Sequence, residues 1–180
     1  MLSEGLYNLR DFFIGNPKVA LCFTGGVNST YLLYVGKQCG ANIKAYYVKT
    51  ALQPQFELDN ALCLAKKFHA SLTVLEADFL SDDIIVENQL DRCYYCKNKL
   101  LSIIKKQAEK DGPRVVVEGS NASDKSGRCL EILGVPELQV HSPLKEFGIT
   151  KTKVRMLSKK AGLLTWDKPV YSCLAAHIPS

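Results

Sequence analysis

The sequence of 180 residues has no run of eighteen apolar residues, so no transmembrane helix is expected. Its first residues carry Glu4 and Asp11 and lack the basic start and apolar core of a signal peptide. They indicate an amphipathic helix over residues 1–15, and a cytoplasmic protein is the expectation. There are no internal repeats, low-complexity segments or linkers, so residues 1–180 are predicted to form a single domain with a sizeable core.

Charge of neither sign dominates the chain. The formal net charge is +5 and the pI is near 8.8, while the hydrophobic share of 47% and the charged share of 23% are ordinary for a globular protein. This mild basic excess is compatible with binding phosphates or RNA, and equally with a solvated basic surface. No dense Arg/Lys stripe interleaved with aromatic residues is present, so a small molecule is favoured over nucleic acid, although tRNA is not excluded.

The seven cysteines are an odd count, and without a signal peptide a disulfide framework is not expected. Cys22, Cys39 and Cys63 lie on apolar segments, where cysteine behaves as a small hydrophobe, so they are predicted to be core residues. Cys93 and Cys96 form a C-x-x-C motif, whose spacing suits a metal, an iron–sulfur cluster or a redox dithiol. The further side chains available to a metal site are Cys129, Cys173 and His177.

Apolar runs of strand length alternate with segments of helical periodicity. The predicted strands cover residues 18–23, 43–48, 71–75 and the apolar part of 114–121. The predicted helices cover residues 28–38, 57–68, 94–110 and 150–161, the last with Thr150 as its cap. Strands that are continuous apolar runs are typical of a parallel sheet that is buried on both faces. We therefore predict an α/β fold, a doubly wound parallel sheet with helices on both faces, followed by a cysteine-bearing tail over residues 163–180.

Ligands of such folds bind at the carboxyl ends of the strands, which here precede residues 24–30, 49–53 and 119–124. The first of these segments, in "FTGGVNST", has no Lys after its glycines, so it is not a G-x-x-x-x-G-K loop. Gly25 and Gly26 let an anion approach the main chain closely, and the N–H groups of the following helix would face that anion. The loop also offers the hydroxyl groups of Thr24, Ser29 and Thr30. These features favour a pyrophosphate-binding loop over a plain turn capped by Asn28 or Ser29.

The same stretch resembles the S-G-G-x-D-S-S/T loop of the PP-loop ATP pyrophosphatases. Members of this superfamily cleave ATP between the α- and β-phosphates and adenylate a carbonyl or carboxylate, from which a nucleophile displaces AMP. The resemblance implies ATP and Mg²⁺ as cofactors. Thr24 stands where Ser is usual and keeps the hydroxyl, whereas Asn28 replaces the Asp that is expected to help hold Mg²⁺. Because an amide is a weaker ligand for a hard cation, a non-catalytic nucleotide-binding subunit is one alternative.

A narrower resemblance covers nearly the whole chain. In order along the sequence, the matching segments are "DRCYYCK", "VVVEGSNASD", "VHSPLKEFGITKTKVR" and "WDKPVYSCLAAHIP". Together with the glycine loop, these segments resemble the LarE-type, or ExsB-like, ATP-dependent sulfur transferases. The implied reaction adenylates a carboxylate of a pyridinium biscarboxylate mononucleotide, releases pyrophosphate, and converts the carboxylate to a thiocarboxylate. The tRNA thiolases, which share the loop and a cluster-binding cysteine set, are a second alternative.

The resemblance also implies a source for the sulfur. Cys173 matches a cysteine that some members sacrifice, so that it becomes dehydroalanine. Other members hold a [4Fe–4S] cluster that carries the sulfur, for which the matching ligands are Cys93, Cys96 and Cys173, with Cys129 as an alternate. Arg92 and Lys97 flank the C-x-x-C motif and are candidates to lower a thiol pKa or to hold a substrate phosphate.

Further positions match the family around the nucleotide. Lys151 and Arg155 are four residues apart on one predicted helical face, where they would bind phosphate and take part in catalysis, or simply form a solvated basic face. Asn121 and Asp124 would reach the nucleotide or its metal, or else only shape a turn. The remaining nucleotide-binding candidates are Lys49 and Gly119.

Two departures from the family pattern stand near the C-terminal end. The usual "CLASR" segment is "CLAAH" here, with His177 in place of an arginine that is a plausible phosphate ligand. The family also has a further C-terminal region, used in oligomer contacts and substrate binding, so a truncated chain or a reduced homologue is expected. A homo-oligomer is implied by the same resemblance.

Overall fold

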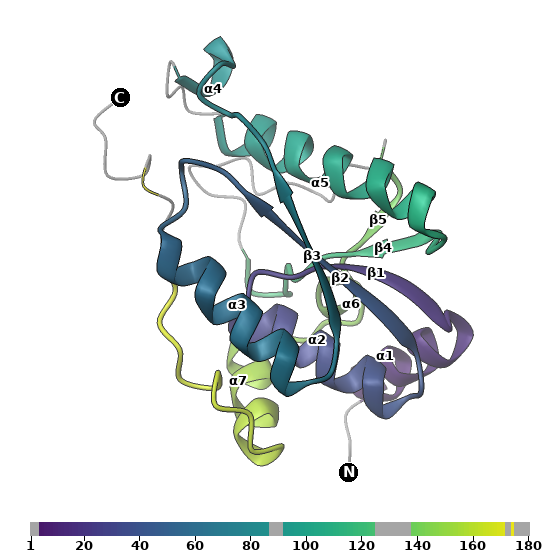
Figure 1. Ribbon diagram of the computed structural model, residues 1–180. Helices are drawn as coiled ribbons and strands as arrows, with labels where there is room; N and C mark the ends of the chain where they lie inside the picture. Colours follow the sequence, from purple (N-terminus) through teal and green to yellow (C-terminus); the bar gives the residue numbers. More distant parts are fainter. Residues whose placement is uncertain (1–3, 87–91, 125–137, 172–173, 175–180) are drawn as a thin grey trace.

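The computed structural model describes residues 4–86, 92–124, 138–171 and 174, which form a sheet flanked by helices (Figure 1). The strands are β1 (Lys18–Cys22), β2 (Asn42–Lys49), β3 (Ser71–Glu76), β4 (Val115–Val117) and β5 (Val140–His141). The helices are α1 (Glu4–Gly15), α2 (Val27–Gln38), α3 (Gln55–Lys67), α4 (Asp83–Val86), α5 (Arg92–Asp111), α6 (Pro143–Glu146) and α7 (Lys151–Lys160). No helix within these described ranges is both long enough and apolar enough to cross a bilayer.

The sheet is parallel throughout, with the strand order β3-β2-β1-β4-β5. β1 lies at its centre, where Val19 is in register with Ile43 of β2 on one side and with Val115 of β4 on the other. β2 and β3 lie on one side of β1, and after β3 the chain crosses over so that β4 and β5 lie on the other side. The predicted doubly wound fold is confirmed. The loops after β1 and β4 leave the sheet at the switch point, where open sheets of this kind bind ligands.

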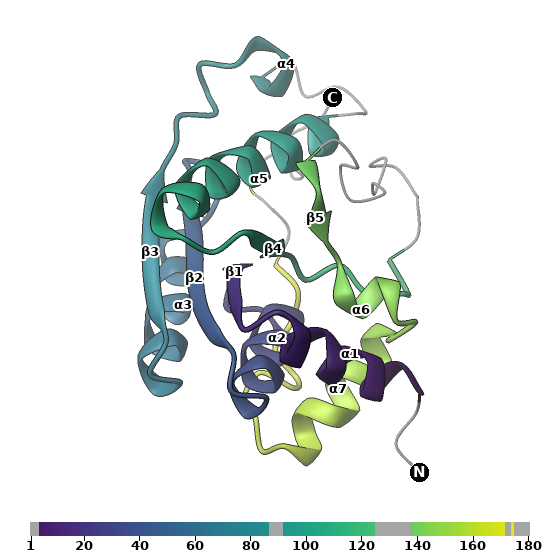
Figure 2. The same cartoon turned by 90° about the vertical axis from the view of Figure 1, so that its right-hand side faces the viewer.

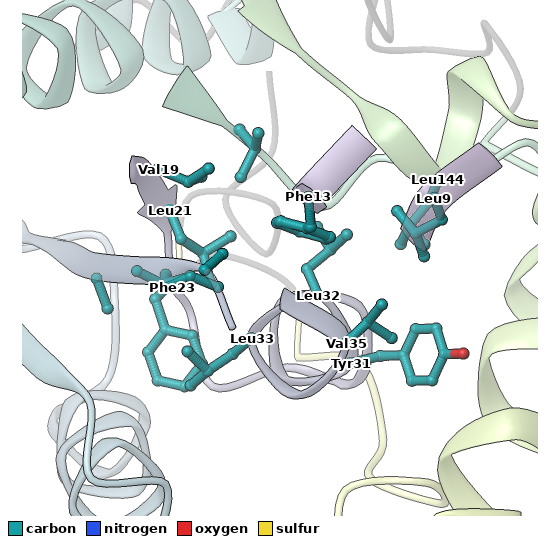
Figure 3. Close-up of a cluster of buried hydrophobic side chains, with 14 of the residues drawn as sticks. Leu9, Phe13, Val19, Leu21, Phe23, Tyr31, Leu32, Leu33, Val35 and Leu144 are labelled. Carbon is teal, nitrogen blue, oxygen red and sulfur yellow. The ribbon is translucent and has the colours of Figure 1, made fainter. Parts of the chain in front are cut away.

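The two faces of the sheet are covered by different helices (Figure 2). Successive strand residues point to opposite faces, so Leu21 packs with α1 and α2, while Ala20 packs against Ile104 of α5. Figure 3 shows the larger cluster, in which Phe13 of α1 and Leu32 of α2 point toward Leu21 of β1. Helices on both faces hold the central strands rigidly and so fix the positions of the loops at their ends.

Three details of the sequence interpretation need correction. The edge strand β3 is not buried on both faces, since none of its residues is fully buried and its Val74 is 36% exposed. Helices cover the faces of the strands at the edge of the sheet less completely than those of the central strands. Cys63 is not a core residue, because α3 turns Ala61 and Ala65 inward and leaves Cys63 exposed to solvent. β5 and α6 were not predicted, since segments of two and four residues are too short to show a periodicity.

Asp111 ends α5 and joins that helix to β2. Its carboxylate accepts a hydrogen bond from Tyr46 Oη at 2.8 Å and pairs with Lys44 Nζ at 2.7 Å. The hydrogen bonds from Lys44 and Tyr46 lower the pKa of Asp111. Burial, together with the hydrogen bond to Asp111, raises the pKa of Tyr46 above its usual value. The carboxylate of Asp111 therefore stabilises the fold in its ionised form.

Replacing Asp111 by Asn is expected to lower the urea midpoint of unfolding at neutral pH. A carboxyl whose pKa is lowered by folding contributes stability above its unfolded pKa of about 4, and this contribution is lost as the pH falls through the lower folded pKa. The difference between the wild type and Asp111→Asn should therefore shrink in acid. Glu109→Gln, at an exposed position of α5, is the matched control. A difference that stays undiminished in acid would contradict this assignment.

Candidate functional site

A cavity of about 470 Å³ opens at the carboxyl ends of β1, β2 and β4. Its walls come from segments that are distant in the sequence, namely the glycine loop, the start of α3, the turn after β4, the start of α7 and residues 168–171. Of the predicted nucleotide and phosphate ligands, those lining the cavity are Thr24, Gly26, Asn28, Ser29, Gly119, Asn121, Asp124 and Lys151. Most of the residues that the sequence singles out around the nucleotide thus lie in one place.

The glycine loop ends at α2, whose N-cap is Gly26 without any side-chain cap. The predicted alternative, a turn capped by Asn28 or Ser29, is therefore wrong. The hydroxyl of Ser29 lies 3.3 Å from both Thr24 Oγ1 and the carbonyl oxygen of Gly26, which draws the loop together. The first N–H groups of any α-helix have no partner within the helix, and here they stand at the cavity wall. With the helix dipole, they favour an anion at this point.

Gly25 has a backbone φ of +67°, a conformation that residues other than glycine rarely adopt. A Cβ atom at this position would lie 3.0 Å from the Cα of Ala61 and 3.2 Å from its nitrogen. The loop therefore passes directly against the backbone of α3. Both the conformation and the close packing require glycine here, so the path of the loop is fixed by the position of α3.

Asn28 joins the two loops that leave the switch point. Its Nδ2 donates a hydrogen bond to the carbonyl oxygen of Gly119 at 2.7 Å. A Cβ atom at Gly119 would lie only 3.2 Å from the Cβ of Asn28, so the two segments are in close contact. The Oδ1 of Asn28 is buried, and no hydrogen-bond donor reaches it from the described part of the chain. Because a buried acceptor is costly to leave unpaired, this oxygen suits a ligand donor or a hard cation such as Mg²⁺.

The turn after β4 is built by its own side chains. Asn121 is almost fully buried. The backbone N–H and the Nδ2 of Asn121 each donate a hydrogen bond of 2.8 Å to the carboxylate of Asp124. Ser123 donates its N–H to Asn121 Oδ1 and accepts a hydrogen bond from the N–H of Lys151 through its hydroxyl. The amide of Asn121 thus shapes the turn, as the turn-forming alternative predicted. The turn positions Lys151, which begins α7, at the cavity.

Glu118 is a buried carboxylate beside the cavity that sequence reasoning missed. It accepts hydrogen bonds from the N–H and hydroxyl of Ser120 and from the hydroxyl of Ser142, and Lys97 Nζ lies 3.2 Å from it. Lys97 thus pairs with Glu118 and Ser120, and its charge offsets part of the rise in the pKa of the nearby Cys22 thiol. Burial and the charge of Glu118 raise the pKa of Cys22 to about 12, so this cavity-lining thiol is protonated. The only signal for Glu118 was a charged residue directly after three valines.

Four predicted binding residues lie outside the lining of this cavity, and one of them is Gly25 of the glycine loop. Lys49 donates to the carbonyl oxygen of Gln53 and lines a separate hollow near Glu76 and Asp78. Thr30 is fully buried within α2. Arg155 donates through Nη1 to the carbonyl oxygen of Trp166 at 2.7 Å and through Nη2 to that of Lys168 at 2.8 Å. The guanidinium of Arg155 therefore holds the backbone of residues 166 and 168.

Residues 166–171, which we call the strap, form a wall of the cavity that the sequence did not predict. The strap follows α7 and runs beside α3, as the yellow segment of Figure 1 shows. Lys168 Nζ donates to the carbonyl oxygen of Gly25 at 3.2 Å, and the ring of Tyr171 packs edge-on against Phe56 at 4.9 Å. The strap thus brings a lysine to a loop that has none in its own sequence.

The C-x-x-C motif lies at the start of α5, and that helix contributes Leu100 to the cavity wall. Cys93 is disulfide-bonded, which differs from the expectation that the cysteines of this chain form no disulfide framework. Arg92 Nη2 lies 3.7 Å from Cys93 Sγ, so the guanidinium is next to the sulfur of the motif. Cys129 and Cys173 fall outside the described residues, and within those residues no three metal-ligating side chains lie together. Cys93 and Cys96 are two of the three cluster ligands that the family resemblance implies; the sulfur of Cys96 is a thiol, whereas the disulfide of Cys93 would have to be reduced before that sulfur could bind iron.

Comparison with known proteins gives three sequence relatives, while no family model matches the chain. A protein of uncharacterized function from Synechocystis sp. is 32% identical over an alignment of 181 positions, which covers 99% of this chain and 67% of that protein. The pyridinium-3,5-bisthiocarboxylic acid mononucleotide synthase of Lactiplantibacillus plantarum is 29% identical, over 90% of this chain and 59% of the synthase. An uncharacterized protein of Methanocaldococcus jannaschii is 28% identical, over 87% of this chain and 59% of that protein. The chain spans about six-tenths of the length of the last two.

Solved structures with the same arrangement of strands and helices have low sequence identity. An NH₃-dependent NAD synthetase from Campylobacter jejuni has a TM-score of 0.67 at 15% identity, covering 94% of this chain and 78% of its own. A tRNA thiolase from Methanococcus maripaludis, solved with its [4Fe–4S] cluster, has a TM-score of 0.66 at 17% identity, covering 97% and 69%. At these identities the likeness concerns the fold, which agrees with the predicted α/β sheet.

Proposed function

Because this chain belongs to the LarE-type family of the PP-loop ATP pyrophosphatase superfamily, we propose that it is an ATP-dependent sulfur transferase acting on a small nucleotide-like carboxylate. The observation that carries the proposal is the glycine loop at the switch point. It has no lysine of its own, it opens into the cavity, and it is tied by Asn28 to the turn after β4. Such a loop suits a pyrophosphate group held by main-chain N–H groups.

The cavity offers both halves of an ATP site. The phosphates would lie along the glycine loop, near Lys151 and the N-terminus of α2. The adenine would lie against the apolar part of the lining, where Tyr47, Val48 and Pro54 stand. Asn28 Oδ1 and Asp124 would hold Mg²⁺, which neutralises phosphate charge when it is bound. A carboxylate oxygen of the acceptor then attacks the α-phosphorus of ATP, the bond to pyrophosphate breaks, and an acyl adenylate forms.

Sulfur would enter in the second half of the reaction. The thiolate of Cys173 attacks the acyl carbon, and AMP leaves with the electron pair of the broken C–O bond. A base then removes the Cα proton of Cys173, the Cβ–S bond breaks, and the products are a thiocarboxylate and dehydroalanine. In the alternative version, Cys93, Cys96 and Cys173 would hold a [4Fe–4S] cluster, which would supply the sulfide that serves as the sulfur donor.

The proposal is tested with the purified protein, MgATP and pyridinium biscarboxylate mononucleotide under anaerobic conditions. We expect AMP and pyrophosphate to form only when the acceptor is present, together with a thiocarboxylate detectable by mass spectrometry. Binding of ATP without AMP formation, with this acceptor and with other carboxylates, would instead indicate a nucleotide-binding subunit.

A tRNA thiolase is the second candidate, favoured by the C-x-x-C motif and by the fold shared with a thiolase that carries a cluster. Unmodified tRNA replaces the mononucleotide in the same assay. We expect no thiolated nucleoside to form. If one forms, the tRNA thiolase function is favoured over the function proposed above.

Replacing Asn28 by Asp, the residue usual in the superfamily, should have two opposed effects. The hydrogen bond to Gly119 is lost and a carboxylate faces that carbonyl, so the free energy of unfolding without Mg²⁺ should fall by about 1–3 kcal/mol. The carboxylate is a better ligand for a hard cation, so Mg²⁺ should stabilise the ATP-bound variant more than it stabilises the wild type. Urea unfolding with and without MgATP measures both effects.

The control for this experiment is Asn16→Asp. Asn16 Nδ2 also donates to a backbone carbonyl, that of Phe12 at 2.8 Å, but it lies outside the lining of the cavity. This variant should lose stability without gaining a response to Mg²⁺. An equal Mg²⁺ response in both variants would contradict the assignment of Asn28 to the metal.

A further inference from the structure

The glycine loop lacks the lysine that other phosphate loops carry, yet a lysine reaches it from the far end of the chain. Two lysines line the described cavity, Lys151 and Lys168. Lys168 is the one that touches the loop, since its Nζ donates to the carbonyl oxygen of Gly25 at 3.2 Å. We propose that Lys168 binds the pyrophosphate end of ATP, and that Arg155 is a positioning residue that acts through it. This inference rests on the proposed function, because it takes ATP as the ligand.

The surroundings of Lys168 leave its ammonium group able to bind a further anion. An ammonium carries three N–H donors, and within the described chain Lys168 Nζ has two oxygen partners. These are Gly25 at 3.2 Å and Glu57 Oε1 at 4.0 Å, and the side chain is 15% exposed. Glu57 also lines the cavity, so its carboxylate stands beside the ammonium at the cavity wall. A phosphate at the loop would complete the set of acceptors at short range, away from most solvent screening.

Arg155 fixes the backbone on which Lys168 stands. Its two terminal nitrogens hold the carbonyl oxygens of Trp166 and Lys168, so one guanidinium spans the segment that leads to the lysine. Lys159, one turn further along α7, lies over the ring of Trp166 at 4.3 Å. On the opposite side, Tyr171 packs against Phe56 of α3. The strap is therefore fastened on both sides of Lys168, and a lysine in place of Arg155 could not span both carbonyls.

A purely structural role for Lys168 would be to bridge the strap to α3 through Glu57. The two roles differ in what they predict for ligand binding. If the ion pair with Glu57 were the purpose of Lys168, then Glu57→Gln and Lys168→Met would lose the same function. If Lys168 binds phosphate, Glu57→Gln removes a competing acceptor, and the variant should bind pyrophosphate at least as tightly as the wild type.

The test is isothermal titration calorimetry of the full chain with inorganic pyrophosphate, ATP and AMP. For Lys168→Met we expect the Kd of pyrophosphate and of ATP to rise about tenfold to a hundredfold, as for the loss of one charge-assisted hydrogen bond. The Kd of AMP, which lacks the β- and γ-phosphates, should not change. Lys168→Arg should keep most of the affinity. Lys160→Met, at an exposed lysine of α7, is the control for charge, and thermal unfolding of each variant reports whether it is folded.

Arg155→Met should weaken pyrophosphate binding in the same direction. The double variant Arg155→Met/Lys168→Met should be no weaker than Lys168→Met alone, because Arg155 acts through Lys168. Additive losses would overturn the positioning role of Arg155.

The remaining outcomes separate this inference from the proposed function. An unchanged Kd of pyrophosphate in a folded Lys168→Met protein, or an equal loss for AMP, would overturn the role of Lys168 while the wild type still binds ATP. A wild-type protein that binds neither ATP nor pyrophosphate would overturn both proposals.

Discussion

Gly25→Ala is expected to lose ATP binding by more than about tenfold and to unfold more easily than the wild type. An Ala in the left-handed region costs about 1–2 kcal/mol, and φ at Gly25 is +67°. In addition, the new Cβ atom would lie 3.0 Å from the Cα of Ala61, so the loop or α3 must move. Either movement shifts the N–H groups that are proposed to hold the phosphates. The Kd of ATP from calorimetry and the urea midpoint measure the two effects.

Gly40→Ala is the matched control for this variant. Gly40 has a similar backbone conformation, with φ of +77°, but a Cβ atom there meets nothing within 4 Å. It should therefore show the conformational cost in stability without any change in ATP binding. If both variants bind ATP like the wild type, the loop does not form the nucleotide site.

Cys173→Ser is expected to abolish thiocarboxylate formation while pyrophosphate release from ATP continues in a single turnover. Adenylation uses the carboxylate of the acceptor as nucleophile, so it does not need the thiol, whereas the sulfur-transfer step requires Cys173 in both versions of the proposed reaction. Quantifying pyrophosphate and thiocarboxylate in one anaerobic reaction measures the adenylation step and the sulfur-transfer step together. Cys63→Ser, at an exposed cysteine of α3, should leave both products unchanged.

The same assay distinguishes the two sulfur sources. If Cys173 is sacrificed, the wild-type protein should lose the mass of hydrogen sulfide after one turnover, and Cys96→Ser should keep sulfur transfer. If a cluster carries the sulfur, Cys96→Ser should lose transfer, and the protein should contain iron and labile sulfide. A Cys173→Ser protein that still makes thiocarboxylate would exclude both versions.

Much of the sheet could be predicted from the sequence because its central strands are continuous apolar runs. β1 and β2 show this pattern clearly, and each lies between neighbours on both sides. The helix that carries Cys93 and Cys96 was also predicted from its periodicity, as was the Thr150 cap, whose Oγ1 accepts the N–H of Lys153. These features depend on local sequence alone, which is why they could be found without the structure.

Contacts between distant segments could not be predicted in the same way. Helical spacing places Lys151 and Arg155 on one face of α7, but it does not predict that Arg155 donates hydrogen bonds to the backbone carbonyls of the strap. Likewise Asn28 occupies a position typical of a helix cap, and only the crossover that brings Gly119 beside it gives its amide a different partner. Lys168 stands in a quoted motif, yet its contact with Gly25 joins residues 143 positions apart.

The strand order also has a consequence for how the protein folds. β1, β2 and β3 follow one another along the chain, so their pairing closes comparatively short loops, whereas pairing of β4 with β1 joins residues nearly a hundred positions apart. Contacts of long sequence separation form slowly, because the entropy of loop closure must be overcome first. The hydrogen bond between Asn28 and Gly119 can form only after that pairing. Folding intermediates that contain only the first three strands would not bind nucleotide. Because only the native state binds it, a bound nucleotide would shift the folding equilibrium toward the native state.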